Sequence, residues 1–65
     1  MLKDIIESYL KLGVSLKSIA DRSGVHYTTL SKWLNGTREL NEKNSAQVEV
    51  ALREIASELV KIWSD

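Results

Sequence analysis

The chain has 65 residues, with nine basic and nine acidic side chains, a formal net charge of zero and no cysteine. This length predicts a single domain over residues 1–65, near the lower size limit for independent folding, so burial supplied by a partner is expected. The composition excludes disulfides and thiolate metal sites, offers neither a membrane-spanning apolar run nor a secretory signal, and leaves the cytoplasm as the expected location.

The first expected helix covers about Leu2 to Leu12, and Gly13 is a suitable stop. Charged residues occupy one face of this segment, and apolar residues recur on the other at helical spacing. The apolar face consists of Leu2, Ile5, Ile6, Tyr9 and Leu10. Because Leu, Ile and Val recur at helical spacing through the rest of the chain as well, the predicted class is all-α.

Two short helices are expected next. Ser15 is a suitable N-cap for the first, which runs to about Ser23. The second begins at His26 or Tyr27 and ends near Asn35, before Gly36.

The joint between these two helices has the features of a helix-turn-helix. Ala20 is small where the helices must touch, and Gly24 permits a left-handed turn. The expected inward-facing residues are Ile19, Val25, Leu30 and Trp33. The pattern predicts a helix-turn-helix over about residues 16–35.

A long C-terminal helix is expected over about residues 42–63, with Asn41 as its cap. An apolar stripe follows 4-3-4-3 spacing through Val48, Leu52, Ile55, Leu59 and Ile62. The first half of the stripe should close the core. The second half, ending at Trp63, should overhang and remain exposed, and we expect Leu59, Ile62 and Trp63 to form a dimer interface.

The stretch from about Val14 to Asn41 resembles the lambda-repressor-like family of phage and bacterial DNA-binding domains. The resemblance depends on I-A-x-x-x-G-V, which begins at Ile19, followed at the correct spacing by W-L-N-G, which begins at Trp33. It implies a four- or five-helix domain that binds double-stranded DNA. Two residues depart from the pattern: Ser23 where a larger apolar residue is common, and Leu16 where a phosphate-bracing glutamine is common.

The second helix of the unit would then enter the major groove and read bases. The resemblance, together with the outward positions of this helix, gives the base-reading candidates Tyr27, Thr28, Ser31 and Lys32. Helix N-termini and the loop after the recognition helix are the expected phosphate contacts. These candidates are Lys17, Ser18, Asn35, Thr37, Arg38 and Asn41.

The charges are unevenly distributed along the chain. Residues 15–38 hold Lys17, Arg22, Lys32 and Arg38 against Asp21 alone, a net charge of +3, whereas residues 39–65 sum to −3. This separation predicts a basic DNA-facing side and an acidic far side. The overall neutrality predicts only modest non-specific affinity.

No residue pattern indicates catalysis, a cofactor or a metal ion. His26 is the only histidine, and we interpret it as a surface residue near a helix N-cap, with a phosphate contact as the alternative. Trp33 and Trp63 are interpreted as packing residues rather than stacking platforms.

The sequence therefore predicts a small phage-type repressor that binds a palindromic operator as a homodimer. Two alternatives remain open. One is a protein-binding module on the same scaffold, such as an antirepressor or the inhibitor of another regulator or effector. The other is the antitoxin of a toxin–antitoxin pair, with its C-terminal stripe covering a protein partner.

Overall fold

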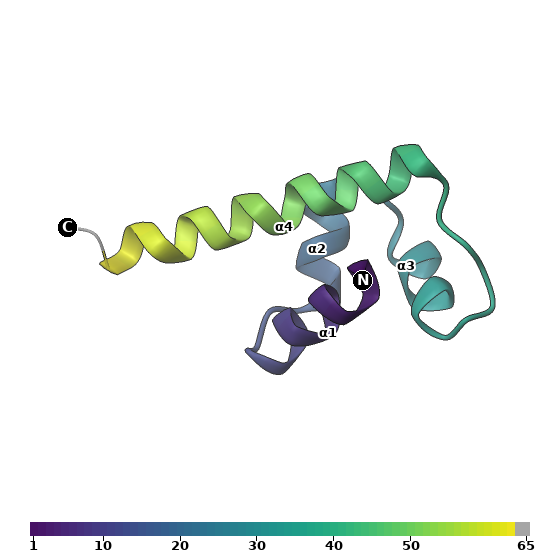
Figure 1. Ribbon diagram of the computed structural model, residues 1–65, viewed down its shortest axis with the longest axis horizontal. Helices are drawn as coiled ribbons and strands as arrows, with labels where there is room; N and C mark the ends of the chain where they lie inside the picture. The colour runs from purple at the N-terminus through teal and green to yellow at the C-terminus, as the bar shows by residue number, and fades with distance from the viewer. Residues whose placement is uncertain (64–65) are drawn as a thin grey trace.

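Four helices make up the fold, and the computed structural model describes residues 1–63 of it. These helices are α1 (Leu2–Lys11), α2 (Leu16–Ser23), α3 (Tyr27–Leu34) and α4 (Glu42–Trp63). The described residues contain no strand, which confirms the all-α prediction. Figure 1 shows α1, α2 and α3 gathered on one side of α4, with the C-terminal end of α4 projecting beyond them. Because α4 is continuous, residues 1–63 form four helices rather than five.

Side-chain caps fix where the helices begin. The Ser15 hydroxyl accepts a hydrogen bond of 3.1 Å from the Ser18 backbone N–H at the start of α2. At the start of α4, Asn41 Oδ1 accepts one of 2.7 Å from the Asn44 N–H. These bonds satisfy backbone donors that a helix leaves unpaired in its first turn, so both boundaries follow from local sequence.

Gly24 makes the turn between α2 and α3. Its φ is +74°, in the left-handed region, and its N–H donates to the Ala20 carbonyl, which closes α2. A side chain is disfavoured in this conformation, which explains the glycine at this position.

The core lies where all four helices meet. Ile6 of α1, Ile19 of α2, Leu30 of α3 and Val48 of α4 are fully buried. The cluster also includes Ala20, Val25, Leu52 and Ile55. Val25 and Leu30 are therefore inward-facing as predicted, and Trp33 packs against the cluster from a half-buried position.

Ser23 has a defined structural role despite its departure from the family pattern. Its buried hydroxyl donates to the Ala20 carbonyl at 3.2 Å and accepts from the Val25 N–H at the same distance. The hydroxyl therefore ties the last turn of α2 to the residue that follows the Gly24 turn. A hydrogen-bonded polar side chain replaces apolar packing at this point.

Two long-range polar contacts fasten α4 to the first two helices. The Tyr9 hydroxyl donates to the Leu52 carbonyl at 3.1 Å. Arg22, in the last turn of α2, donates to both carboxylate oxygens of Glu58, at 2.6 and 2.5 Å. This bidentate geometry holds two planar groups in a fixed orientation and is more specific than a single contact.

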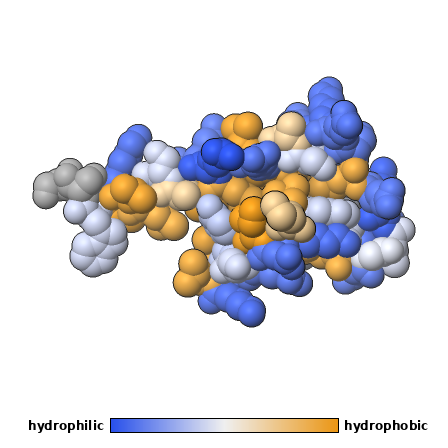
Figure 2. All heavy atoms as spheres, viewed as in Figure 1, coloured by the Kyte–Doolittle hydropathy of each residue, from blue (hydrophilic) through white to orange (hydrophobic). Residues whose placement is uncertain are grey.

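The end of α4 extends past the body of the protein as an apolar overhang, defined here as residues 59–63. Its side chains are exposed: Leu59 by 47 %, Ile62 by 68 % and Trp63 by 89 %. Figure 2 shows hydrophobic side chains beside paler and hydrophilic ones on this projecting end. As predicted, the stripe of α4 is buried at Val48, Leu52 and Ile55 and exposed beyond them.

Candidate nucleic-acid interface

The outer face of α3 carries the four residues proposed to read bases. With about 100° between successive residues, Tyr27, Thr28, Ser31 and Lys32 fall on one arc of the helix, and Leu30 and Trp33 fall on the other. Tyr27, Thr28 and Lys32 are exposed and Ser31 is half-buried. We call these four residues the recognition face. Their side chains offer hydroxyl groups, an ammonium group and an aromatic ring, all of which suit base edges or phosphates.

His26 fixes the start of α3. Its Nδ1 accepts a hydrogen bond of 3.1 Å from the Thr28 N–H, so the imidazole serves as the N-cap of the recognition helix. Nδ1 is therefore the acceptor nitrogen of this ring, and Nε2 is the nitrogen not used by the cap. The prediction of a surface residue at the N-cap is confirmed, since the side chain is exposed.

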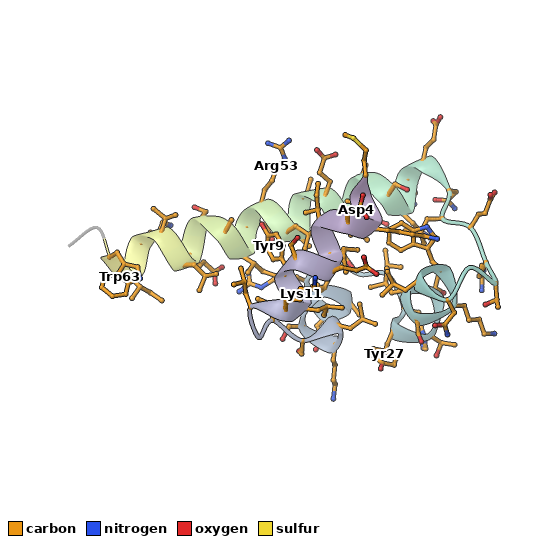
Figure 3. The ribbon with its side chains drawn as sticks, turned by 60° about the horizontal axis from the view of Figure 1, so that its bottom comes forward. Asp4, Tyr9, Lys11, Tyr27, Arg53 and Trp63 are labelled. Atoms are coloured by element: carbon orange, nitrogen blue, oxygen red, sulfur yellow. The ribbon has the colours of Figure 1, made fainter. Side chains whose placement is uncertain are left out.

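A shallow hollow separates the beginnings of α2 and α3. Lys17 and Asp21 line it from α2, and Gly24, His26 and Tyr27 line it from the turn and α3. The Tyr27 side chain is half exposed and points away from the body of the protein (Figure 3). This arrangement places the Tyr27 ring and the Lys17 side chain around one concave surface.

The first turn of α2 presents Lys17 and Ser18 to solvent. The Ser18 hydroxyl also accepts a hydrogen bond of 2.9 Å from the Ser15 hydroxyl. Leu16, which stands where the family commonly has glutamine, is instead half-buried and packs against the core. The structure therefore uses this position for packing, and it offers no polar group there to brace α3 against a phosphate.

The loop between α3 and α4 holds the other phosphate candidates, Asn35, Thr37, Arg38 and Asn41, all exposed. The Thr37 hydroxyl and N–H both contact the Lys32 carbonyl, at 3.0 and 2.9 Å, and so close the end of α3. Asn41 uses its Oδ1 for the α4 cap, which leaves its amide Nδ2 as the donor for a phosphate.

The net charge that residues 15–38 present to solvent differs from the charge counted in the sequence, because of one residue. Arg22 contributes to the predicted +3, but its guanidinium binds Glu58 on α4. This bond raises the pKa of Arg22 and lowers the pKa of Glu58, so both groups stay charged and neutralise each other. The cations that remain among residues 15–38 are Lys17, Lys32 and Arg38, against Asp21. The basic excess is therefore smaller than predicted.

The structure separates the predicted dimer residues from the recognition face. Leu59, Ile62 and Trp63 lie on the overhang, and α3 lies near the opposite end of α4 (Figures 1 and 3). The expected interface and the expected DNA surface therefore do not compete for the same residues.

Two contacts between distant residues were not predicted from the sequence. The Arg22–Glu58 pair joins residues 36 positions apart, and the Tyr9–Leu52 bond joins residues 43 apart. No local signal pointed to the first contact, because a basic residue in the last turn of a helix, such as Arg22 in α2, is ordinary. Tyr9 could be assigned to the apolar face of α1, but its acceptor depended on the way α4 crosses α1.

Residues 1–63 contain no cluster of His, Cys, Asp or Glu that could hold a metal ion. None of the four helices combines the length and apolar character required to cross a membrane.

A family model described as helix-turn-helix matches residues 2–58, which include all of α1, α2 and α3 and most of α4. Comparisons with curated proteins and with solved structures found no match.

Proposed function

Since the chain belongs to the lambda-repressor/Cro-type helix-turn-helix family of DNA-binding transcription regulators, we propose that it is a small phage-type repressor that binds a palindromic operator as a homodimer. In this proposal α3 lies in the major groove, and Tyr27, Thr28, Ser31 and Lys32 read base edges. Lys17, Ser18, Asn35, Thr37, Arg38 and Asn41 bind phosphates on either side.

The main support is the recognition face itself. It is a polar, exposed arc on a short helix whose start is capped by His26 and whose opposite side is anchored in the core by Leu30. The two groups of phosphate candidates come just before and just after this arc, in α2 and in the loop that follows α3. Side chains at both ends of a groove-binding helix would fix its register on the duplex.

The proposed repressor is tested by footprinting on DNA upstream of its own gene. We expect protection of two half-sites with centres about 34 Å apart, one turn of the duplex. Binding should weaken steeply with salt because phosphate contacts release counterions. A titration that is flat and independent of salt at low ionic strength, for every candidate operator, would refute DNA binding by this surface.

A second candidate function uses the scaffold to bind another protein, as an antirepressor, an inhibitor or an antitoxin does. It is favoured by the exposed overhang and by the missing polar group at Leu16. A pull-down with the products of neighbouring genes, repeated with Leu59→Asp, distinguishes it from the repressor. Capture of such a product through the overhang, without protection of any operator, would support the protein-binding function.

A further inference from the structure

The end of α4 opposite the overhang borders a hollow of about 520 Å³ between α1, α3, α4 and the loop before α4. Its wall is apolar where Leu2, Ile5, Trp33 and Leu40 line it. Two carboxylates, of Glu42 and Glu49, stand at its α4 side. We call it the Trp33 hollow. Its volume lies within the range that accommodates a drug-sized molecule, so an indole ring fits inside it.

The chain exposes an indole that cannot reach this hollow within the same molecule. Trp63 is 89 % exposed at the far end of α4 (Figure 3). Along one continuous helix the axial separation of Ser45, which lines the hollow, and Trp63 is about 27 Å at 1.5 Å per residue. An apolar hollow and an exposed aromatic side chain are therefore held apart by the rigid helix that connects them.

Both features lie on the same side of α4. One line along the helix, at spacings of three and four residues, connects the hollow to the overhang through Ala46, Glu49, Arg53, Ala56, Val60 and Trp63. Glu49 follows the buried Val48, so this line is turned about 100° from the core face. The hollow at one end of this line and Trp63 at the other are the two halves that a two-fold dimer requires, since the same patch must serve in both copies. Arg53, in the middle of the line, is bound by Glu49 of its own helix.

We propose that the occupant of the Trp33 hollow is the overhang of a second copy of this chain, inserted reciprocally. Two α4 helices lie antiparallel along the line from Ala46 to Trp63, and each Trp63 enters the hollow of the other copy. This inference rests on the homodimer in the proposed function, and it replaces tail-to-tail contact with contact between unlike ends of α4.

Size and direction agree with this occupant. Val60 and Trp63 are the overhang residues that lie on this line. An aromatic side chain buries about 150–250 Å² and an aliphatic one about 100 Å², so these residues of two copies and the surfaces beneath them would bury roughly 1,200 Å², the lower end of the range for a stable interface. The two-fold axis is perpendicular to the plane of the paired helices, which keeps both helix-turn-helix units on one side.

Site-specific cross-linking tests the arrangement, because the chain has no native cysteine. A sample of Ala46→Cys is mixed with Val60→Cys and treated with a short bismaleimide. Reciprocal insertion predicts a cross-link between positions 46 and 60 of different copies. It also predicts little product from Val60→Cys alone, because the two positions 60 would be about 21 Å apart along the helices. Tail-to-tail pairing predicts the reverse.

Sedimentation supplies the second measurement. We expect Trp63→Ala to raise the dissociation constant of the dimer roughly thirtyfold, as loss of a central aromatic anchor does. Ala46→Arg should also weaken the dimer by filling the hollow. Val50→Arg is the matched control, because Val50 is an exposed α4 residue that does not line this hollow. Its dimer should match the wild type.

Each outcome of these experiments either supports or overturns reciprocal insertion. A dimer that cross-links only through Val60→Cys, or through neither position, overturns reciprocal insertion while leaving the homodimer intact. A wild type that is monomeric at micromolar concentration overturns both. Operator binding is measured separately by footprinting, so a dimer that fails to bind DNA would refute the repressor function without refuting the interface.

Discussion

At the scale of single residues, substitution of Lys32 distinguishes base reading from general electrostatic attraction to DNA. It is exposed on the recognition face, in the last turn of α3, and a lysine ammonium can donate to guanine O6 and N7. We expect Lys32→Ala to cost about 1–3 kcal/mol on the best operator and to relax the preference at one base pair. Gel shifts against a set of operator variants measure both effects. An unchanged ranking of the variants would show that Lys32 does not read a base.

Arg38 offers the complementary test, because it lies in the exposed loop after α3. If its guanidinium contacts a phosphate, Arg38→Ala weakens specific and random DNA alike. The slope of log affinity against log salt should also become shallower by about one unit. Salt titrations of both duplexes provide the measurement. A loss confined to the specific operator would instead assign Arg38 to base reading.

Ser23 is the residue at which hydrogen bonding replaces apolar packing. Removing its hydroxyl leaves the N–H of the buried Val25 without its side-chain acceptor. We expect Ser23→Ala to lower the free energy of unfolding by about 1–3 kcal/mol, the range for a buried donor left without a partner. Denaturant melts followed by circular dichroism test this, with Ser57→Ala as an exposed serine control. Equal stability of the two variants would contradict the role assigned to the Ser23 hydroxyl.

At the scale of elements, the Arg22–Glu58 pair links α2 to the point where α4 leaves the body of the protein. The hydrogen bond from Arg22 lowers the pKa of Glu58 below that of an ordinary glutamate. A carboxyl group with a lowered folded-state pKa stabilises the fold at pH values above its unfolded-state pKa, about 4.3. This stabilisation is lost as the pH falls through the lower, folded-state pKa.

Acid should therefore loosen α4 in the wild type more than in Glu58→Gln. We expect the difference in melting temperature between these two proteins to be largest near neutral pH and to shrink below about pH 4. Thermal melts from pH 7 to pH 2 give the profile, with Glu7→Gln as the control, because Glu7 is an exposed glutamate on α1. A difference that does not depend on pH would mean that the pair contributes no charge-dependent stability.

At the scale of the whole molecule, the overhang is an apolar surface that a single copy of the chain leaves exposed. Leu59 is 47 % exposed in the isolated chain, and burying such a side chain gains about 1.5–3 kcal/mol, a large amount for so small a core. We expect Leu59→Asp to be monomeric and to bind the operator much more weakly, with its helicity nearly unchanged. Sedimentation, circular dichroism and gel shifts on one sample measure all three properties.

Ser57→Asp is the matched control for Leu59→Asp, since Ser57 is exposed on α4 away from the apolar stripe. It should remain dimeric. If Leu59→Asp sediments like the wild type while Ser57→Asp does not, the interface lies on another face of α4.

The sequence by itself determined the features that depend on near neighbours. Helix starts at Ser15 and Asn41 and the turn at Gly24 arise from bonds or torsions within a few residues, so local pattern was sufficient to place them. The apolar stripe of α4 also follows from spacing alone, including the point at which burial stops. The recognition face could be proposed for the same reason, because a short helix with one apolar side has only one side left to present.

Only the tertiary structure decided which distant groups meet. In the sequence, Arg22 counts as one of the cations of the helix-turn-helix. In the structure, the crossing of α2 and α4 places its guanidinium against Glu58. The acceptor of Tyr9 and the Trp33 hollow likewise depend on how α1 and the loop before α4 sit against α4. No spacing rule connects residues this far apart in the chain, because their separation in space is set by how the helices pack in the core.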